Sequence, residues 1–330
     1  MKTRSNALSL GLAIAMVLTL GLPPLSVHAQ GKYPERPIRL VIPFSPGGNT
    51  DVVGRLFAAK MTLTLGQQVF VENKAGASGE IGSLDVARAG PDGYTLLVGV
   101  ASTHVINPLT KKLPYDPVKD FTPINLFSVT PQALGVHPTI GTSLPELIKR
   151  VKAKPGEYAY GSCGVASICH LTGALFIRQT GGLEMIHVPY KGSGQSVQEL
   201  IGGQVPMVFG TTTSMVTHHR SGRLRMLAVF NEKRSAVEPS VPTAIELGVP
   251  DAVAYTFTLL LAPAGTPKPV IERLQQATSK TMSDVPFQKN LERLTVDPVT
   301  DSNPETAARF IKAELAKWAP LVEAMNLRAK

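Results

Sequence analysis

Residues 38–61 read IRLVIPFSPGGNTDVVGRLFAAKM, an apolar run that passes through a glycine-rich turn into a helical pattern. The apolar run 38–43 predicts a buried strand, and the periodicity of residues 51–65 predicts a helix. The first N–H groups of a helix have no partner inside it, and the helix dipole places about half a positive charge there. Glycine also lets the preceding turn bring its own N–H groups close to a ligand. The stretch therefore predicts a strand–turn–helix unit whose turn can bind an anion.

A second stretch repeats this design. Residues 158–178 read YAYGSCGVASICH and then LTGALFIR, which predicts a strand at 157–160 and a helix at 167–180. Two such turns, far apart in sequence, can face each other across a cleft and hold an anion without any basic side chain. The pattern favours a binding protein over an enzyme.

Strand and helix patterns alternate throughout the rest of the chain, which predicts an α/β fold with mainly parallel sheets and helices on both faces. One long sheet would accommodate these elements, but two lobes explain their layout better. The extended segments 127–136 and 255–262 would then carry the chain between the lobes. We expect a discontinuous lobe 1, residues 30–131 and 253–330, and a lobe 2, residues 132–252.

Residues 1–29 have the pattern of a signal peptide. Lys2 and Arg4 begin it, residues 7–22 are almost wholly apolar, and Val27-His28-Ala29 is typical of a cleavage site near Ala29. An uncleaved membrane anchor is the alternative, but the apolar run is short for a span. We therefore expect a soluble periplasmic protein.

Composition narrows the function classes. The formal net charge of +9 is spread over single basic residues, and the aromatic content of 6% is low and not interleaved with them, so nucleic-acid binding is not expected. The two cysteines, Cys163 and Cys169, lie in the second stretch. A disulfide that stiffens the turn and a pair of unbonded thiols are both open interpretations. No ligand set with zinc spacing accompanies them, and no metal or cofactor is expected.

Seven segments together resemble one known family. They are PFSPGGNTDVVGR (43–55), VENKAGASGEIG (71–82), LPYDPVKDFTPI (113–124), YGSCGVASICHLTGALF (160–176), VPYKGSGQSVQELIGGQV (188–205), LAPAGTPKPVIERL (261–274) and AELAKW (313–318). In this order, and across the whole mature chain, they are similar to the extracytoplasmic solute receptors of tripartite tricarboxylate transporters, also called the Bordetella uptake gene (Bug) family.

The resemblance implies a two-lobed, Venus flytrap receptor of the periplasmic-binding-protein type. Such a receptor closes on a small carboxylate, partly through ordered water, and hands it to membrane transporter subunits. Cys163, Val165 and Cys169 depart from the more glycine-rich second turn of relatives. The ligand stays open between dicarboxylates, tricarboxylates, aromatic acids and amino acids, and we expect a monomer.

The first turn is expected to hold the carboxylate through backbone N–H groups of residues 47–50 and the hydroxyls of Ser45 and Thr50. Phe44 is expected to wall the cleft. The residues assigned to this site are Phe44, Ser45, Gly47, Gly48, Asn49, Thr50 and Asp51. Asp51 has two possible roles: to cap the following helix by accepting its first N–H groups, or to pair with the amino group of an amino-acid ligand.

The second turn is expected to offer N–H and hydroxyl donors in the same way. Its residues are Ser162, Cys163, Gly164 and Ser167, and Thr103 and Thr211 join the site because they follow predicted strands. Strand-end threonines also serve as caps. We expect His170 to pack inside its helix, Lys191, His218 and His219 to lie at the surface, and Trp318 to belong to the core.

The chain lacks the sequences G-x-S-x-G, G-x-G-x-x-G and the phosphate loop that ends in GK[ST]. A periplasmic hydrolase that uses Ser162 or Cys163 with His170 is the enzyme alternative, and it requires a base within hydrogen-bond reach. A sensor that shows its closed form to a membrane signalling protein is a third hypothesis.

Overall fold

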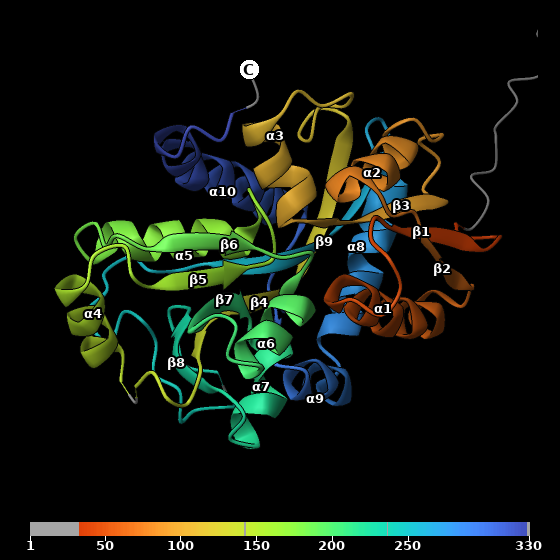
Figure 1. The fold of residues 1–330 in the computed structure, drawn as a ribbon. Helices are drawn as coiled ribbons and strands as arrows, with labels where there is room; N and C mark the ends of the chain where they lie inside the picture. Colours follow the sequence, from red (N-terminus) through yellow and green to blue (C-terminus); the bar gives the residue numbers. More distant parts are fainter. Residues whose placement is uncertain (1–32, 142, 236, 329–330) are drawn as a thin grey trace, which may run out of the picture. The chain divides into compact units, whose positions relative to one another are not determined.

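The computed structural model describes residues 33–141, 143–235 and 237–328 (Figure 1). The predicted signal peptide and its cleavage site lie outside the described residues. The chain divides into a short N-terminal unit, Met1–Glu35, and the unit Arg36–Lys330, which holds the fold. Within the described part of the chain, no helix combines the length and the apolar character that crossing a bilayer requires.

The elements of the first half follow the predicted alternation closely. They are β1 (Ile38–Ile42), α1 (Asn49–Leu65), β2 (Val69–Asn73), the short helix η1 (Ala77–Gly79), α2 (Glu80–Ala87), β3 (Thr95–Val100), the π-helical segment η2 (Ser102–Ile106), α3 (Asn107–Thr110), β4 (Phe121–Val136) and α4 (Leu144–Ala153).

The second half continues the pattern. Its elements are β5 (Ala159–Ser162), α5 (Ile168–Gln179), β6 (Ile186–Pro189), α6 (Ser193–Ile201), β7 (Met207–Thr211), α7 (Thr212–Arg220), β8 (Arg225–Phe230), β9 (Tyr255–Pro263), α8 (Lys268–Met282), α9 (Val285–Arg293), β10 (Asp297–Pro298) and α10 (Pro304–Ala324).

The strands of the described residues are ordered β2-β1-β3-β9-β4-β7-β5-β6, and β8 and β10 also pair with β4. Strands β1, β2 and β3 are parallel to one another, as are β5, β6 and β7. Strands β7, β8, β9 and β10 pair with β4 in the antiparallel sense, and β9 pairs with β3 likewise. Each half of the fold is thus a parallel α/β unit, as predicted, and antiparallel strands join the halves.

The long strand β4 belongs to both sheets. Its residues Phe121 to Pro131 pair with β9, whereas Gln132 to Val136 pair with β7 and β8. We call the sheet of β1, β2, β3 and β9 the first sheet and that of β5, β6, β7 and β8 the second sheet. The partners of β4 change between Pro131 and Gln132, where the sequence predicts the division between the lobes.

Aromatic side chains fill the core on both sides of this change. Phe57 of α1 stacks on Phe127 of β4 with 4.2 Å between ring centroids. Phe209 of the second sheet contacts Phe176 and Phe230. Full burial of such a ring contributes roughly 1.5–3 kcal/mol. Trp318 of α10 is buried in the core, as predicted.

Candidate functional site

The carboxyl ends of the parallel strands in both sheets are directed toward the same part of β4. Val100, at the end of β3, is level with Thr258 of β9 and through it with Ser128 of β4. Thr211, at the end of β7, is paired with Gln132 of β4. Since β3 runs in the direction of β4 and β7 runs against it, these ends approach each other along β4. Ser128 and Gln132, the residues of β4 level with these two strand ends, are four residues apart, which is about 13 Å along the strand.

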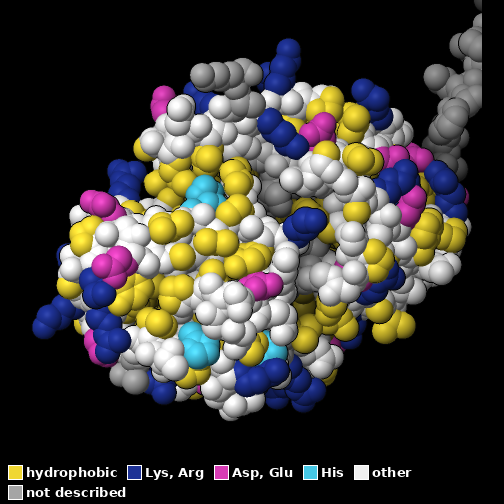
Figure 2. All heavy atoms as spheres, viewed as in Figure 1, with side chains coloured by type: hydrophobic (Ala, Val, Ile, Leu, Met, Phe, Trp, Pro, Cys, Tyr) yellow, Lys and Arg dark blue, Asp and Glu magenta, His cyan; other side chains and the backbone are white. Residues whose placement is uncertain are grey.

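The turns that leave these strand ends therefore open toward the boundary between the sheets. The space-filling view shows a hollow on this face, between the part of the surface that α6 forms and the part that α1 and α2 form (Figure 2). Among the hydrogen bonds of the described residues, none joins the first turn, residues 43–50, to the second turn, residues 162–167.

The first turn is held from behind by Asp51. This carboxylate is 3% exposed, and it accepts the Gly47 N–H at 2.9 Å, the Asn73 amide at 2.8 Å and the Arg55 guanidinium at 2.9 Å. Burial alone would raise the pKa of Asp51, but the hydrogen bonds from Arg55, Gly47 and Asn73 and the charge of Arg55 hold that pKa below its ordinary value. The capping role predicted for Asp51 is wrong, since its carboxylate accepts the N–H of Gly47, before α1, rather than the first helical N–H groups. The pairing of Asp51 with a ligand amino group stays a prediction.

This network changes which donors the first turn can offer. The Gly47 N–H is already bonded to Asp51, so the prediction that it holds a ligand is wrong in this structure. The first N–H groups of α1 have no intrahelical partner by geometry, and the helix begins at Asn49 after Gly48. Ser45 and Gly48 are exposed, and Phe44, Asn49 and Thr50 are half-buried. The first turn thus presents main-chain donors on a helix N-terminus, beside two hydroxyls.

A third loop lies beside the first turn, and the sequence analysis did not assign it to the site. Four consecutive residues, Gly76 to Gly79, have positive φ angles, including 49° at Ala77 and 59° at Ser78. A Cβ atom on Gly79 would lie 2.6 Å from the Thr103 methyl and 3.1 Å from the Phe44 ring. The loop therefore packs on two residues of the predicted site. Backbone strain of this kind concentrates at ligand clamps, and the glycine spacing of residues 76–82 was its only sequence signal.

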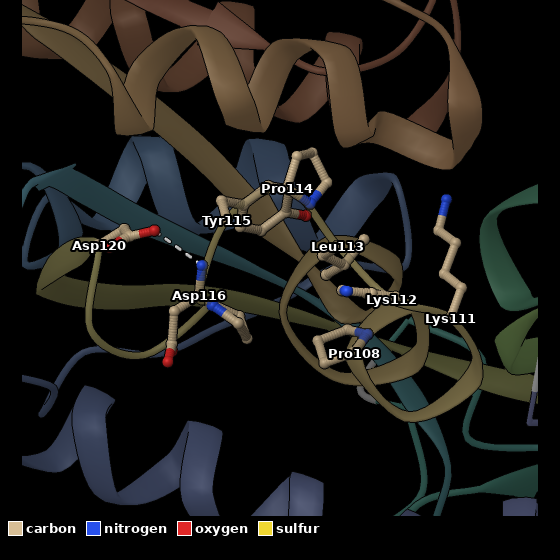
Figure 3. Close-up of a pocket in the computed structure, with 9 residues that line it drawn as sticks. Pro108, Lys111, Lys112, Leu113, Pro114, Tyr115, Asp116 and Asp120 are labelled. Carbon is tan, nitrogen blue, oxygen red and sulfur yellow. Dashed lines mark hydrogen bonds between the residues drawn. The ribbon is translucent and has the colours of Figure 1, made fainter.

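Lys111 braces this strained loop. Its ammonium donates to the Ala77 carbonyl at 3.0 Å and pairs with Glu80 at 2.8 Å, and Asn107 donates to the Ser78 carbonyl at 3.0 Å. Figure 3 shows Lys111 at the edge of a surface hollow of about 580 Å³, directed away from Lys112 and Leu113. Inside the hollow, the Asp116 N–H donates to Asp120 at 2.7 Å. Lys111 thus lines this hollow while it stabilises the loop of residues 76–79, and we assign the hollow a structural role.

Thr103 lies at the end of β3, as predicted, but its hydroxyl is used inside the protein. The residue is 0% exposed, and its Oγ1 lies 3.0 Å from the Val100 nitrogen and 2.8 Å from His104 Nδ1. The Thr103 hydroxyl thus joins η2 to the end of β3, and it caps no helix; its methyl group lies against the loop at Gly79. Thr211 is the residue before α7, and its hydroxyl donates to Ser214 at 3.2 Å.

The second turn is closed by bonds of its own. Ser162 is 0% exposed, and its Oγ accepts the Gly164 N–H at 3.2 Å. The Ser167 hydroxyl donates to the Gly164 carbonyl at 2.7 Å and accepts the His170 N–H at the start of α5. The hydroxyls of Ser162 and Ser167 thus shape the turn, and what the turn can present to a ligand is main chain.

Cys163 and Cys169 form a disulfide across the second turn, with 5.7 Å between their Cα atoms. The structure therefore supports the disulfide interpretation, and neither cysteine is a free thiol. The Ser193 hydroxyl at the start of α6 lies 3.1 Å from the Cys163 sulfur. The bond ties the tip of the turn to the first turn of α5.

His170 and His187 lie behind the second turn. His170 is 6% exposed, in agreement with the expectation that it packs inside the fold. Its ring stacks on that of His187, with 3.8 Å between centroids and 5° between planes. His187, which the sequence analysis did not single out, accepts or donates at 2.7 Å to Ser162 Oγ. Because these contacts join α5 to β6, no local pattern could reveal them.

The geometry does not favour the hydrolase alternative. The base beside Ser162 is His187 rather than His170, and Ser162 has no exposed surface from which to attack a substrate. Cys163 is bonded to Cys169. Within the described residues, no group of three or more His, Cys, Asp or Glu side chains could hold a metal ion.

The remaining residues have local roles. Lys191 is exposed, as expected, and its N–H donates to Gln195 at 2.9 Å. His218 and His219 are half-buried rather than fully at the surface; the Arg223 guanidinium lies 2.5 Å from His218, and His219 accepts the Met226 N–H at 3.2 Å.

Comparisons with known proteins agree with this architecture. Residues 53–327 match the family model of the tripartite tricarboxylate transporter family receptor. Protein BugT of Bordetella pertussis is 36% identical over 90% of this chain and 92% of its own. The structure of the periplasmic binding protein BugD superposes with a TM-score of 0.78 at 33% identity, over 90% of this chain and all of that one. The structure of Rpa4515 of R. palustris with adipate superposes with a TM-score of 0.80 at 32% identity, over 88% of this chain and 97% of that one.

Proposed function

The chain belongs to the tripartite tricarboxylate transporter receptor family, and from that premise we propose that it captures a small organic carboxylate between its two glycine-rich turns and delivers it to a membrane transporter. Members of this family are solute-binding receptors, and the R. palustris relative holds a dicarboxylate, adipate. The observation that carries the proposal for this chain is the pairing register of β4, which directs the strand ends of both sheets toward one boundary.

The chemistry of the turns suits a carboxylate. Both turns offer neutral main-chain N–H groups at helix N-termini, where the dipole favours a negative charge. Arg55 of α1 has its guanidinium bonded to Asp51 and Asn73. Neutral donors leave no unpaired charge in the cleft when the ligand departs, so the empty receptor is stable in water.

Capture then follows from a shift between open and closed forms. A ligand that contacts both turns stabilises the closed form by its differential contacts, and a membrane partner can recognise that form. In this proposal lobe 1 comprises residues 30–131 and 253–330, and lobe 2 comprises residues 132–252. The receptor acts in the periplasm as a monomer.

A ligand screen tests the proposal. Purified receptor is heated with a panel of dicarboxylates that includes adipate, together with tricarboxylates, aromatic acids and amino acids. A ligand present at 1,000 times its Kd adds about 4 kcal/mol to the unfolding free energy and raises Tm by several degrees. Neutral esters of the same acids are expected to leave Tm unchanged. If no member of the panel raises Tm, the capture of small carboxylates is refuted.

The placement of the first turn has a sharper test. A Cβ atom on Gly48 would meet only the Ser45 carbonyl, at 3.8 Å, so Gly48→Leu fits the fold but fills the mouth of the helix N-terminus. We expect at least a tenfold loss of affinity for the best acid, or about 1.4 kcal/mol, with Tm of the free protein near that of the wild type. Gly90→Leu is the matched control, since nothing lies within 4 Å of its Cβ position. Equal affinity in both variants would remove the first turn from the site.

A further inference from the structure

The two ends of the second turn are each bonded to one of two stacked imidazoles. Ser162, where β5 ends, lies 2.7 Å from Nε2 of His187, and the Ala166 N–H donates to Nδ1 of His170 at 3.2 Å. The rings lie face to face with 3.8 Å between their centroids. The turn therefore rests on a pair of histidines that come from different elements, α5 and β6.

The hydrogen bond from the Ala166 N–H requires a lone pair on Nδ1 of His170, and Ser162 has a donor for which two acceptors compete. The Ser162 hydroxyl accepts the Gly164 N–H and has one proton, for which His187 Nε2 at 2.7 Å is the closer acceptor than the Gly164 carbonyl at 3.2 Å. With this choice of acceptor for the Ser162 proton, a neutral His187 carries its own proton on Nδ1. His170 accepts at Nδ1 and so carries its proton on Nε2. His170 is thus a neutral acceptor when the turn is formed, and His187 is one in the arrangement that we assign, with the Ser162 proton on the shorter contact.

The turn needs this support because its backbone is strained. Ala166 has a φ of 53° and Gly164 a φ of 127°, and a residue with a side chain rarely adopts the first of these. A protonated His170 would direct an N–H at the Ala166 N–H in place of a lone pair. The repulsion of two donors removes the bond that holds Ala166 in its left-handed conformation.

We propose that His170 and His187 are positioning residues of the carboxylate site: as a stacked neutral pair they hold Ala166 and Ser162, and protonation of the pair releases the second turn and its ligand. The inference rests on the proposed function, since it says which residues hold the second of the two turns that bind the carboxylate. It predicts that the receptor loses affinity at low pH because its own histidines are protonated, in addition to any protonation of the ligand.

The surroundings of the pair leave it without a compensating charge. Burial, and then the neighbouring His187, lowers the pKa of His170 to about 4, and burial lowers the pKa of His187. Tyr160 of β5 stacks on His187, and burial raises its pKa to about 12. Burial and then Glu199 of α6 raise the pKa of Tyr190, which follows β6, so both phenols are neutral in acid.

Charged residues also lie on α10, which packs against α5. Its Glu314 and Lys317 lie across a hollow from Arg178, at the opposite end of α5, and they pair with each other at 3.1 Å. A comparison of the wild type with His170→Asn therefore isolates the charge of the histidine, because these acidic neighbours are the same in both proteins.

Matched substitutions separate positioning from packing. His187→Phe keeps the ring but removes the acceptor, and His170→Leu removes the acceptor of Ala166. His187→Gln and His170→Asn place a neutral oxygen near Nε2 and Nδ1, respectively. We expect about tenfold or greater loss of affinity for the best acid in the first two variants at pH 7.5, and affinity within about threefold of the wild type in the other two. His137→Asn, at a histidine bonded to Thr139 beyond β4, is the control.

The pH profile is the decisive readout. In wild-type receptor we expect the backbone amide signals of Gly164 and Ala166 to move together between pH 7.5 and 4 in NMR spectra of the free protein. In His170→Asn the movement of Ala166 is expected to disappear. Affinity for the acid at pH 4, relative to pH 7.5, should fall about twofold further in the wild type than in His170→Asn, because half of the free wild type then carries the proton. The titration of the ligand is common to both proteins and cancels.

The outcomes distinguish the two proposals. Amide signals of Ala166 that ignore pH, or that move equally in His170→Asn, overturn the role of the pair whether or not a ligand is known. Failure of the Gln and Asn variants to restore affinity also overturns it. A wild type that binds no acid at pH 7.5 refutes the proposed function instead, and the NMR titration still decides the histidine pair.

Discussion

The side-chain amide of Asn73 donates to Asp51 Oδ1 at 2.8 Å and to the Phe44 carbonyl at 2.9 Å. Asn73 is the last residue of β2, whereas Phe44 belongs to the turn that leaves β1. One amide thus connects the end of a neighbouring strand to the first turn and to the carboxylate behind it. The shape of this turn is a property of two parallel strands rather than of the glycines alone.

Asn73→Ala is expected to loosen the first turn. The change takes one donor from the buried Asp51 carboxylate, which keeps Arg55, and removes the side-chain donor of the Phe44 carbonyl, so the unfolding free energy should fall by about 1–3 kcal/mol. Urea unfolding measures this loss, and affinity for the best acid should fall with it. Arg36→Ala is the control, because it removes an exposed ion pair with Asp92 and a contact with the Tyr94 ring, near the start of β1, and should cost about 1 kcal/mol or less. Equal losses in both variants would contradict the role given to Asn73.

The lowered pKa of Asp51 gives a second prediction. A carboxyl whose pKa is lower in the folded than in the unfolded chain stabilises the fold above its unfolded pKa, near 3.8, and this stabilisation is lost as pH falls through the folded value. Asp51→Asn should therefore weaken the receptor at pH 7 and flatten the dependence of unfolding free energy on pH below about 4. Urea unfolding from pH 7 to pH 3 measures both proteins. Parallel curves would show that Asp51 is not stabilised by its partners.

The loop at residues 75–79 has its own test at Gly79. An alanine there meets the Thr103 methyl at 2.6 Å and the Phe44 ring at 3.1 Å, in addition to its backbone strain. Gly66→Ala is matched, since Gly66 also has a positive φ but has nothing within 4 Å of its Cβ position. We expect Gly79→Ala to cost about 1–3 kcal/mol more than Gly66→Ala in thermal unfolding, and to reduce affinity as Phe44 moves. A similar cost for both would place the loop away from the site.

Local sequence patterns were sufficient to predict the positions of nearly all strands and helices. The strand at Ile38–Ile42 and the helix at Ile168–Gln179 depend on periodicity that neighbouring residues carry. The division into lobes at residues 131 and 132 stays a prediction, and what the structure adds is that β4 changes its partners at the same place. What periodicity could not predict is that this segment is one strand with different partners along its length.

The parts of the site that escaped prediction depend on pairs distant in sequence. The partner of Ser162 is 25 residues away at His187, and that of Asp51 is 22 residues away at Asn73. Both pairs form because parallel strands bring their ends together, and a single sequence does not specify that register. The donors of the first turn were overcounted for the same reason, since the folded carboxylate occupies the Gly47 N–H.

Removal of the disulfide should loosen the second turn more than the fold. Cys163→Ser with Cys169→Ser opens a short loop, which is expected to lower the unfolding free energy by about 2 kcal/mol. The chain has two cysteines in all, so a reductant should have the same effect on the wild type and none on the double variant. Urea unfolding with and without dithiothreitol measures both. If dithiothreitol left the unfolding free energy of the wild type unchanged, the disulfide in this turn would not be accessible to the reductant.

Asp297 of β10 pairs with Val129 of β4, beside the change of partners, and accepts the Asn231 amide at 3.2 Å. Burial, and then the charge of Glu292, raises its pKa to about 6, with the Asn231 bond opposing the rise. Because the folded pKa lies above the unfolded value near 3.8, the neutral carboxyl stabilises the fold at low pH, and that stabilisation is lost as pH rises to about 6. Asp297→Asn keeps the shape without the charge, so it should be more stable than the wild type at pH 7 by up to about 3 kcal/mol and equal to it near pH 4. Unfolding of both proteins at these two pH values tests the sign. A wild type that is the more stable at pH 7 would mean that the ionised carboxylate has a partner that holds the two sheets together.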